Sequence, residues 1–192
     1  MNPWEKTENF DGKVKVYYDN LLNHFKRFNN EVFVESGTFI GNGLKCALDA
    51  GFNKCYSVEI HEHLYKKNLD RFGREIKKGR VTLFHGDSGN ILKSVIADLD
   101  KPATFWLDAH ISSNYGEKLA KNCPVIEELE FIKNSSIKTH TILIDDLNCF
   151  GKEAHDYITL EQVKSYITSI NPEYKFEFLD AAQSKNILVA YI

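Results

Sequence analysis

The sequence predicts a single α/β domain built on a mostly parallel sheet with helices on both faces. Short apolar runs rich in β-branched and aromatic residues alternate with segments whose apolar residues recur at helical spacing. The first apolar run breaks directly into a glycine-spaced loop ahead of a helical pattern, which predicts a strand, a tight turn and a helix. Two further strands lie close together at the end of the chain and can pair only antiparallel, because a parallel pair needs a long crossover.

Each predicted element is bounded by turn residues, caps or charged side chains. The seven strands are predicted at residues 31–35, 54–59, 81–85, 103–108, 139–146, 174–178 and 187–192. Helices are predicted at residues 13–28, 42–50, 61–77 and 89–98. Asn122 and Pro124 are predicted to be the cap and first turn of another helix, and Thr159 with Gln162 has the capping-box pattern of the last one.

Composition excludes several classes of protein. The chain has 192 residues, the size of one domain, which we divide into a helix at 1–30 that packs on the core and the main domain at 31–192. Its 24 Lys and Arg nearly balance 27 Asp and Glu, so no net field favours nucleic acid as a partner. No apolar run approaches the length of a membrane span, and four scattered cysteines with no signal peptide indicate a reducing, cytoplasmic setting.

The loop after the first strand predicts a nucleotide-type pocket. Glycines at positions 37, 41 and 43 follow Glu35 in an E-x-G-x-x-x-G-x-G pattern, and glycine lets the backbone pass close to a ligand. A dinucleotide site requires G-x-G-x-x-G, so this spacing disfavours NAD. Glu59 ends the second strand, where such folds use an acid to bind ribose hydroxyls; a solvated strand-end Glu is the alternative.

This loop resembles the first motif of the class I S-adenosylmethionine (SAM) dependent methyltransferases. The resemblance implies a Rossmann-like seven-stranded methyltransferase sheet with SAM as the cofactor. The carboxylate of Glu35 would face the cationic methionine end of SAM, and Asp87 would accept a hydrogen bond from the adenine amino group or else only cap the next helix. The full set of expected cofactor-binding residues is Glu35, Gly37, Thr38, Gly41, Gly43, Glu59, Ile60, Asp87, Ser88 and Asp108.

Three acids follow the fourth and fifth strands and are candidate metal ligands. Asp108, Asp145 and Asp146 would meet at one edge of the sheet, where gathered carboxylates are costly unless they are protonated, separated or neutralised by a cation. Oxygen ligands favour Mg²⁺ or Mn²⁺ over zinc. The arrangement resembles the metal-dependent O-methyltransferases of the catechol and the macrocin or novobiocin sugar types, which implies these three acids as ligands; capped or solvated strand ends are the alternative.

His110, two residues after Asp108, is the candidate general base. A sugar hydroxyl is a poor nucleophile, so its proton must be removed as the new bond forms, and imidazole titrates near neutral pH. The sugar O-methyltransferases have their base at a similar position but use Asp where this chain has His. A structural hydrogen-bonding histidine is the alternative. His61 and His63 lack further zinc ligands and are expected at the surface.

The acceptor expectation depends on a second resemblance. The segments Trp106-Leu-Asp-Ala-His110, Pro124-Val-Ile-Glu-Glu-Leu129 and Leu143-Ile-Asp-Asp146 are similar to those of small bacterial and viral methyltransferases linked to surface glycans. The resemblance covers residues 31–192 and implies O-methylation of a sugar or glycan hydroxyl. Because no lid domain is evident, we expect an acceptor site that is shallow or completed by a second subunit.

Three other functions remain open. A metal-independent methyltransferase would hold a small phenolic or amine acceptor with Tyr115 and the loop at 111–121. A non-catalytic SAM-binding module would keep the pocket without the chemistry, against which the intact Asp-x-His and Asp-Asp pairs argue. A Rossmann dehydrogenase is disfavoured by the glycine spacing.

Overall fold

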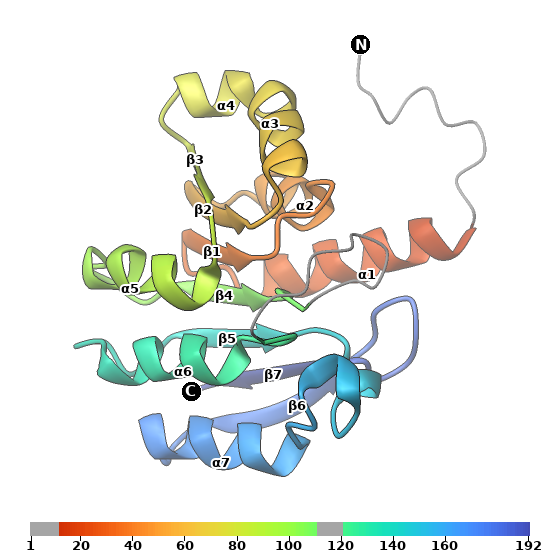
Figure 1. Cartoon of the computed structure of the whole chain (residues 1–192), viewed down its shortest axis with the longest axis vertical. Helices are drawn as coiled ribbons and strands as arrows, with labels where there is room; N and C mark the ends of the chain where they lie inside the picture. Colours follow the sequence, from red (N-terminus) through yellow and green to blue (C-terminus); the bar gives the residue numbers. More distant parts are fainter. Residues whose placement is uncertain (1–11, 111–120) are drawn as a thin grey trace.

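Seven strands form one mixed sheet in a computed structural model that describes residues 12–110 and 121–192 (Figure 1). The strands are β1 (Val32–Ser36), β2 (Lys54–Glu59), β3 (Val81–His85), β4 (Thr104–Leu107), β5 (Thr141–Ile144), β6 (Lys175–Leu179) and β7 (Ile187–Tyr191). Their order across the sheet is β3-β2-β1-β4-β5-β7-β6. Strands β1 to β5 are parallel, whereas β7 is antiparallel to both of its neighbours. The predicted fold class is therefore confirmed.

The helices and short 3-10 segments occupy the connections between the strands. They are α1 (Gly12–Arg27), α2 (Asn42–Ala50), α3 (Glu62–Arg71), α4 (Gly73–Lys77), α5 (Ser88–Ala97), α6 (Val125–Asn134), η2 (Leu147–Cys149), η3 (Glu153–His155) and α7 (Leu160–Ile170). None of the helices in the described part of the chain is long and apolar enough to cross a bilayer.

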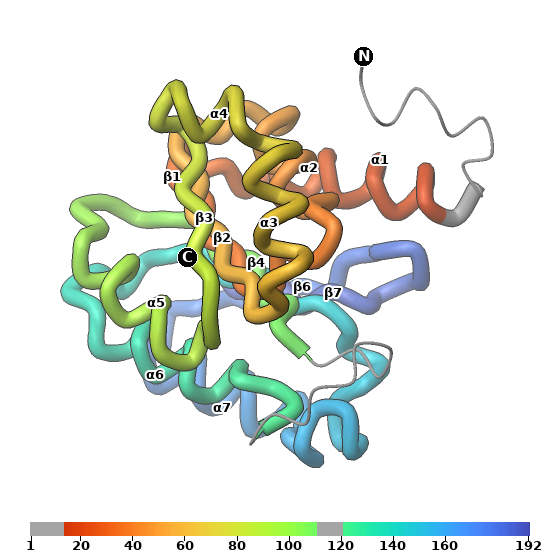
Figure 2. The backbone as a smooth tube through the Cα atoms, turned by 45° about the horizontal axis from the view of Figure 1, so that its top comes forward, coloured from red at the N-terminus to blue at the C-terminus, as the bar shows by residue number. Residues whose placement is uncertain are grey.

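The sheet has one hydrophobic core on each face. Alternate residues of a strand point to opposite faces, so Val32 and Val34 enter one core and Phe33 enters the other. The first core is closed by α5, α6 and α7, and the second by α1 and α2 with Phe72. Figure 2 shows the tube of α3 and α4 beside the β3 end of the sheet. The result is three layers with the sheet in the middle.

The chain reverses its direction of travel across the sheet between β1 and β4. From β1 it passes to β2 and β3 on one side, and it then returns to build β4 and β5 on the other. In open α/β sheets a crevice forms beyond the carboxyl ends of the two strands at such a point, and ligands bind there. The fold thus places the loops after β1 and β4 at the centre of any site.

Two predicted helices differ from the structure at their ends. The helix predicted at 61–77 is divided into α3 and α4 at Phe72, whose side chain is buried beside Gly41 and which precedes Gly73. At the start of α6 the N-cap is Pro124 rather than Asn122, and Asn122 instead binds the carboxylate of Asp156. In both places a tertiary contact determines the boundary. The predicted capping box of Thr159 and Gln162 is present at α7.

Gly37 shows how tightly β1 and β4 approach each other. Its φ is +80°, and a Cβ atom there would lie 2.4 Å from the carbonyl oxygen of Asp108. Main-chain atoms cannot move aside as a flexible side chain can, so position 37 requires glycine for both conformation and space.

We predict that Gly37→Ala lowers the free energy of unfolding by about 3 kcal/mol or more, because strain and overpacking add. Gly51→Ala is the matched control, since Gly51 has a φ of +93° but no atom within 4 Å that an added methyl group would meet. Gly51→Ala should lower the free energy of unfolding by only about 1–2 kcal/mol, the cost of placing alanine in a left-handed backbone conformation. Urea unfolding of both variants checks the difference; equal losses would show that the contact with Asp108 is unimportant.

Glu128 on α6 joins that helix to α5 from inside the protein. Its side chain is only 1% exposed, and its Oε1 accepts a hydrogen bond of 2.6 Å from the hydroxyl of Ser88. Burial raises the pKa of Glu128 to about 7, although the bond from Ser88 opposes the shift. The folded protein therefore holds this proton more tightly than the unfolded chain does, and stability from this group is lost as the pH rises from about 4.5 to 7.

We predict that Glu128→Gln, which stays neutral at every pH, stabilises the protein by about 3 kcal/mol at pH 8 and by much less at pH 5. Urea unfolding of the two proteins at both pH values tests the sign. A gain of the same size at pH 5 and pH 8 would mean that ionisation of Glu128 is not the cause.

Candidate functional site

A cavity of about 730 Å³ opens beyond the carboxyl ends of the parallel strands. Nine of the residues predicted for the site line it: Gly37, Glu59, Ile60, Asp87, Ser88, Asp108, His110, Asp145 and Asp146. They come from the ends of β1 to β5 and the loops that follow. The topology thus brings together residues that are more than a hundred positions apart in the sequence.

The other four predicted residues lie beneath the cavity wall. Glu35 is only 1% exposed, and short hydrogen bonds connect its Oε2 to Ser57 and Ser57 to the hydroxyl of Thr38. Gly41 and Gly43 pack against protein atoms, since a Cβ at Gly43 would lie 2.1 Å from Oε1 of Glu35. The structure therefore gives Glu35, Thr38, Gly41 and Gly43 a role in shaping the loop, and direct contact with a cofactor stays a prediction for them.

Glu59 forms the wall between the loop after β1 and the start of α3. Its Oε2 accepts a hydrogen bond of 2.6 Å from the backbone N–H of Phe39, and its Oε1 accepts one of 2.8 Å from that of His61. A carboxylate oxygen has a second lone pair, so Glu59 retains acceptor capacity for a ligand that enters the cavity. The carboxylate is thus held in one orientation at the surface where ribose hydroxyls are expected.

Asp87 and Ser88 are located where β3 turns into α5. The Asp87 side chain accepts from the backbone N–H of Gly89, as an N-cap does, and also from the amide of Asn90. The hydroxyl of Ser88 is directed to Glu128. Asp87 therefore caps α5, as the alternative interpretation predicted. Asp87 and Ser88 also both line the cavity.

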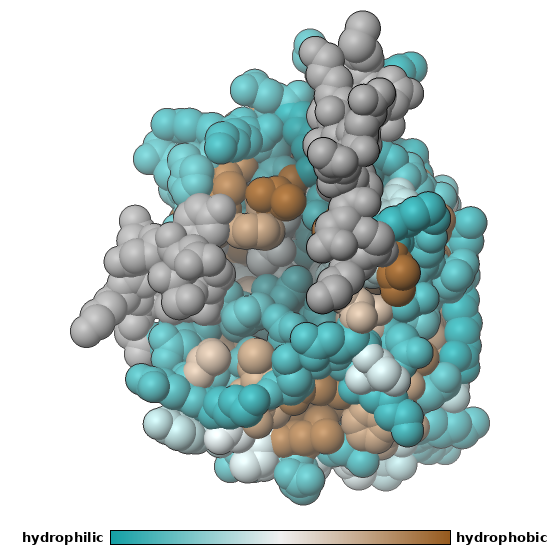
Figure 3. Space-filling view, turned by 90° about the vertical axis from the view of Figure 1, so that its right-hand side faces the viewer, coloured by the Kyte–Doolittle hydropathy of each residue, from teal (hydrophilic) through white to brown (hydrophobic). Residues whose placement is uncertain are grey.

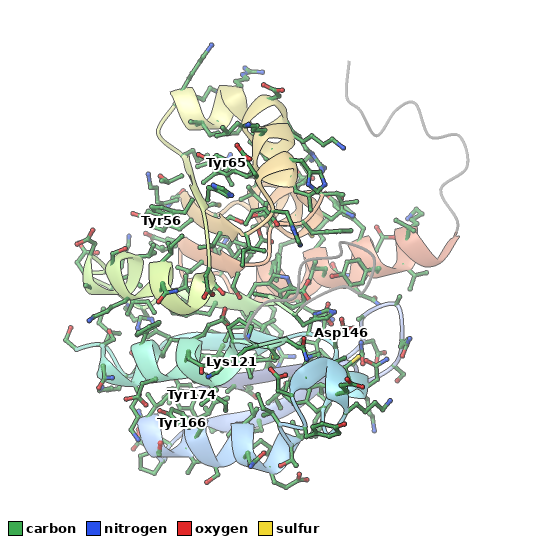
Figure 4. All side chains as sticks on the ribbon, viewed as in Figure 1. Tyr56, Tyr65, Lys121, Asp146, Tyr166 and Tyr174 are labelled. Carbon is green, nitrogen blue, oxygen red and sulfur yellow. The ribbon has the colours of Figure 1, made fainter. Side chains whose placement is uncertain are left out.

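Asp108, His110 and Asp146 converge at the opposite end of the cavity. Nδ1 of His110 lies 3.5 Å from Oδ1 of Asp108, and its Nε2 lies 3.3 Å from Oδ2 of Asp146, the residue labelled in Figure 4. One ligand atom from each of the three residues lies within 4.8 Å of the others. This is a donor set of two carboxylates and one imidazole.

Asp145 is separated from that group by its own hydrogen bonds. Its Oδ2 accepts a bond of 3.2 Å from the hydroxyl of Tyr17, and its Oδ1 accepts one of 2.8 Å from the backbone N–H of Asp146. Asp145 is not one of the three residues whose ligand atoms lie within 4.8 Å of one another, and its role as a metal ligand stays a prediction. Asp146 reaches the cluster because its backbone is left-handed, with a φ of 55°.

Burial and mutual repulsion raise the pKa values of Asp108 and Asp145. The pKa of Asp108 is raised by burial, with His110 opposing the shift, and that of Asp145 is raised to about 8 by burial and then by Asp108 and Asp146. The hydrogen bond to Asp108 raises the pKa of His110. A cation in this place would relieve the repulsion, because carboxylates that share a site resist ionising together.

Tyr17, His61 and His155 lie in or beside the site and were not among the predicted residues. Tyr17 on α1 lines the cavity; burial raises its pKa, and the charge of Asp145 raises it further. His61 was expected at the surface but also lines the cavity. His155, in η3, is buried with its ring 5.2 Å from that of His110, and burial lowers its pKa to about 4. His61 lies two residues after the end of β2, whereas Tyr17 and His155 reach the site through tertiary packing and no local sequence signal marks them. Tyr115 lies outside the described residues.

Comparison with solved structures places this fold among the methyltransferases. The O-methyltransferase TomG from Streptomyces achromogenes, solved with SAM, is similar over 91% of this chain and 78% of its own, with a TM-score of 0.62 and 12% identity. The SAH-bound methyltransferase PaMTH1 of Podospora anserina is similar over 98% of this chain and 84% of its own, with a TM-score of 0.61 and 12% identity. An O-methyltransferase from Bacillus cereus in complex with SAH is similar over 100% of this chain and 84% of its own, with a TM-score of 0.58 and 13% identity.

Sequence comparison alone finds no such likeness. No family model matches the chain, and no curated protein matches it. The likeness to the solved structures therefore extends to the fold: a Rossmann-like methyltransferase sheet with a cavity at the carboxyl ends of its strands.

Proposed function

We propose that this protein is a SAM-dependent O-methyltransferase that transfers a methyl group to a sugar hydroxyl, assisted by a divalent cation. The observation that carries the proposal is the division of one cavity into two ends. Glu59 and Asp87 lie at the end formed by β2 and β3, and Asp108, His110 and Asp146 lie at the end formed by β4 and β5. The first group suits an adenosine, and the second suits the activation of a hydroxyl.

The cofactor assignment is supported by the chemistry of the first group. A fixed carboxylate at the end of β2 is suited to ribose hydroxyls, which donate hydrogen bonds to it. Asp87 and the start of α5 offer an acceptor oxygen for an adenine amino group. When bound there, SAM would supply the methyl group as a cationic sulfonium, which the acids at the other end would attract.

The donor set at the second end fits a divalent cation. Asp108 and Asp146 would hold it with oxygen atoms, and Asp145 stays a candidate through its carboxylate next in the chain. When bound, the cation would lower the pKa of an acceptor hydroxyl. Mg²⁺ or Mn²⁺ suits the carboxylates.

His110 is the general base of the proposed reaction. The carboxylate of Asp108 next to Nδ1 favours a proton on that nitrogen and leaves Nε2 as the acceptor for the substrate proton. The same carboxylate stabilises the imidazolium that forms when the proton arrives. Asp108 thereby has a part in catalysis as well as in metal binding.

The sugar acceptor follows from the resemblance of the sequence and from the polar character of the site. The described residues at this end of the cavity include Lys121, Asn122 and Glu127, which donate or accept hydrogen bonds as a polyhydroxylated acceptor requires. Figure 3, which views the side where the parallel strands end, shows hydrophilic groups over much of the described surface and apolar groups gathered at several places among them.

A metal-independent reaction is the second candidate. His110 lies between Asp108 and Asp146, where a protonated imidazole would itself neutralise part of their charge. In that version the site needs no cation, and the acceptor is a small phenol or amine.

We predict micromolar SAM binding by titration calorimetry and no binding of NAD. Glu59→Gln should weaken SAM binding by about tenfold, because bonds from ribose to a charged acceptor are lost. Glu62→Gln is the control, since Glu62 is exposed on α3 and pairs with Lys66. If NAD binds and SAM does not, in calorimetry and in a second assay such as ligand-induced thermal stabilisation, the cofactor proposal is wrong.

We predict that His110→Gln lowers the rate of methyl transfer by about 10² to 10⁴ while leaving SAM affinity nearly unchanged, as expected for loss of a general base. His24→Gln is the control, because His24 lies on α1 and contacts the backbone of Asp180 instead of the cavity. The rate is measured as SAH release with methyl glycosides, nucleotide sugars and catechol as acceptors, each with Mn²⁺ or with chelator. Transfer to catechol alone, undiminished by chelator, would favour the second candidate, and SAM binding without transfer would favour a non-catalytic module.

A further inference from the structure

The ring of His110 needs an external restraint that its polar contacts do not provide. Its Nδ1 lies 3.5 Å from Asp108 and its Nε2 lies 3.3 Å from Asp146. Both distances exceed the about 2.7–3.2 Å usual for an N–H···O hydrogen bond. The second side-chain torsion of histidine has broad energy wells and does not fix the ring plane by itself. Packing must therefore determine which way the two nitrogens point.

His155 supplies a flat surface against His110. The centroids of the two imidazole rings are 5.2 Å apart and their planes are inclined by 28°, a stacked arrangement. The His155 ring also packs against the ring of Phe150, with the two ring centroids 4.6 Å apart. His155 is only 3% exposed, so its ring has little freedom to turn.

The segment that carries His155 is fixed to the rest of the site. Asp156, the next residue, accepts hydrogen bonds from the backbone N–H of Asn122 at 2.8 Å and of Cys123 at 3.0 Å. The side-chain amide of Asn122 donates to the same carboxylate at 2.9 Å. These bonds connect the end of η3 to the segment that enters α6, and Asp156 makes them from a left-handed backbone with a φ of 50°.

We propose that His155 is a positioning residue, whose stacked ring fixes the plane of His110 so that its nitrogens stay directed toward Asp108 and Asp146. The catalytic consequence of this arrangement depends on the proposed function, whereas the structural consequence does not. The ring face, and not the ring nitrogens, performs the task. In the described part of the chain Nδ1 of His155 has no hydrogen-bond partner, which is a cost that an apolar ring would avoid.

Two substitutions at position 155 separate the ring face from the ring nitrogens. His155→Phe keeps a flat ring and removes both nitrogens, so we expect it to retain kcat within about twofold. His155→Leu is apolar as well but has no flat face, and we expect it to lower kcat on the order of tenfold with the KM for SAM unchanged, because a small misplacement of a catalytic group is costly. If Phe is as defective as Leu, the nitrogens matter and the proposal is wrong; if Leu retains full activity, the stack is unimportant and the proposal is equally wrong.

His140→Leu is the matched control for the loss of a buried imidazole. His140 is fully buried and packs edge-on against Phe105 before β5, at the end of the sheet away from the cavity. Its Nδ1 accepts a hydrogen bond from the backbone of Ala103. We expect His140→Leu to lower thermal stability and leave kcat unchanged. A fall in kcat that tracks stability in both leucine variants would assign the effect of His155 to folding and overturn the proposal.

An NMR measurement tests the proposal without any methyl transfer. In protein labelled with ¹⁵N-histidine, the ring signals of His110, assigned by their loss in His110→Gln, report its tautomer and hydrogen bonds. We expect these signals to keep their positions in His155→Phe and to shift or broaden in His155→Leu. Unchanged His110 signals in His155→Leu would overturn the proposal. A wild-type protein that transfers no methyl group would refute only the proposed function, since the NMR comparison still stands.

Discussion

The close approach of β1 and β4 is the constraint on which the rest of the site depends. These strands are neighbours at the reversal of the sheet, and Gly37 lies directly against the main chain of Asp108. The contact lets the loop after β1 and the acid after β4 form one continuous wall, with Glu59 on one side and Asp145 on the other. A side chain at position 37 would push the two halves of the cavity apart. The shape of the site therefore depends first on how the backbone packs, and the functional side chains are placed on that framework.

The acids gathered at this wall are unfavourable for stability by themselves. Asp108 and Asp145 both have raised pKa values, mainly because they are buried, and Asp146 adds repulsion. A chain selected only for stability would place apolar side chains here, since gathered acids without full compensation usually lower stability. Perturbed carboxylates and a histidine in one cavity are instead the pattern expected of a functional site. The loss of stability caused by these acids therefore supports a catalytic or binding role for this end of the cavity, and this argument does not depend on the likeness to other folds.

The sequence predicted the sheet well because its signals are local. Apolar runs bounded by turns located every strand, and the antiparallel end followed from the short connection between the last two. The candidate site was predictable where a residue ends a strand, as with Glu59, Asp108 and Asp146. No motif marks Tyr17, which lines the cavity from α1, or His155 in η3, whose ring stacks on that of His110. Nor did any pattern indicate that the hydroxyl of Tyr17 would donate a hydrogen bond to Asp145.

The glycine loop illustrates how a sequence pattern can have a physical basis other than the one it suggests. The spacing of Gly37, Gly41 and Gly43 predicted room for a ligand, but the atoms that exclude a side chain at these positions belong to the protein itself. Gly43 makes room for the buried carboxylate of Glu35, and Gly41 makes room for Asn68 and Phe72. The fold thus requires glycine at all three positions, and Gly37 also lines the cavity, where its contact with a cofactor stays a prediction. The stronger case for an adenosine comes from Glu59 and Asp87, whose carboxylates line the cavity while the backbone holds them in place.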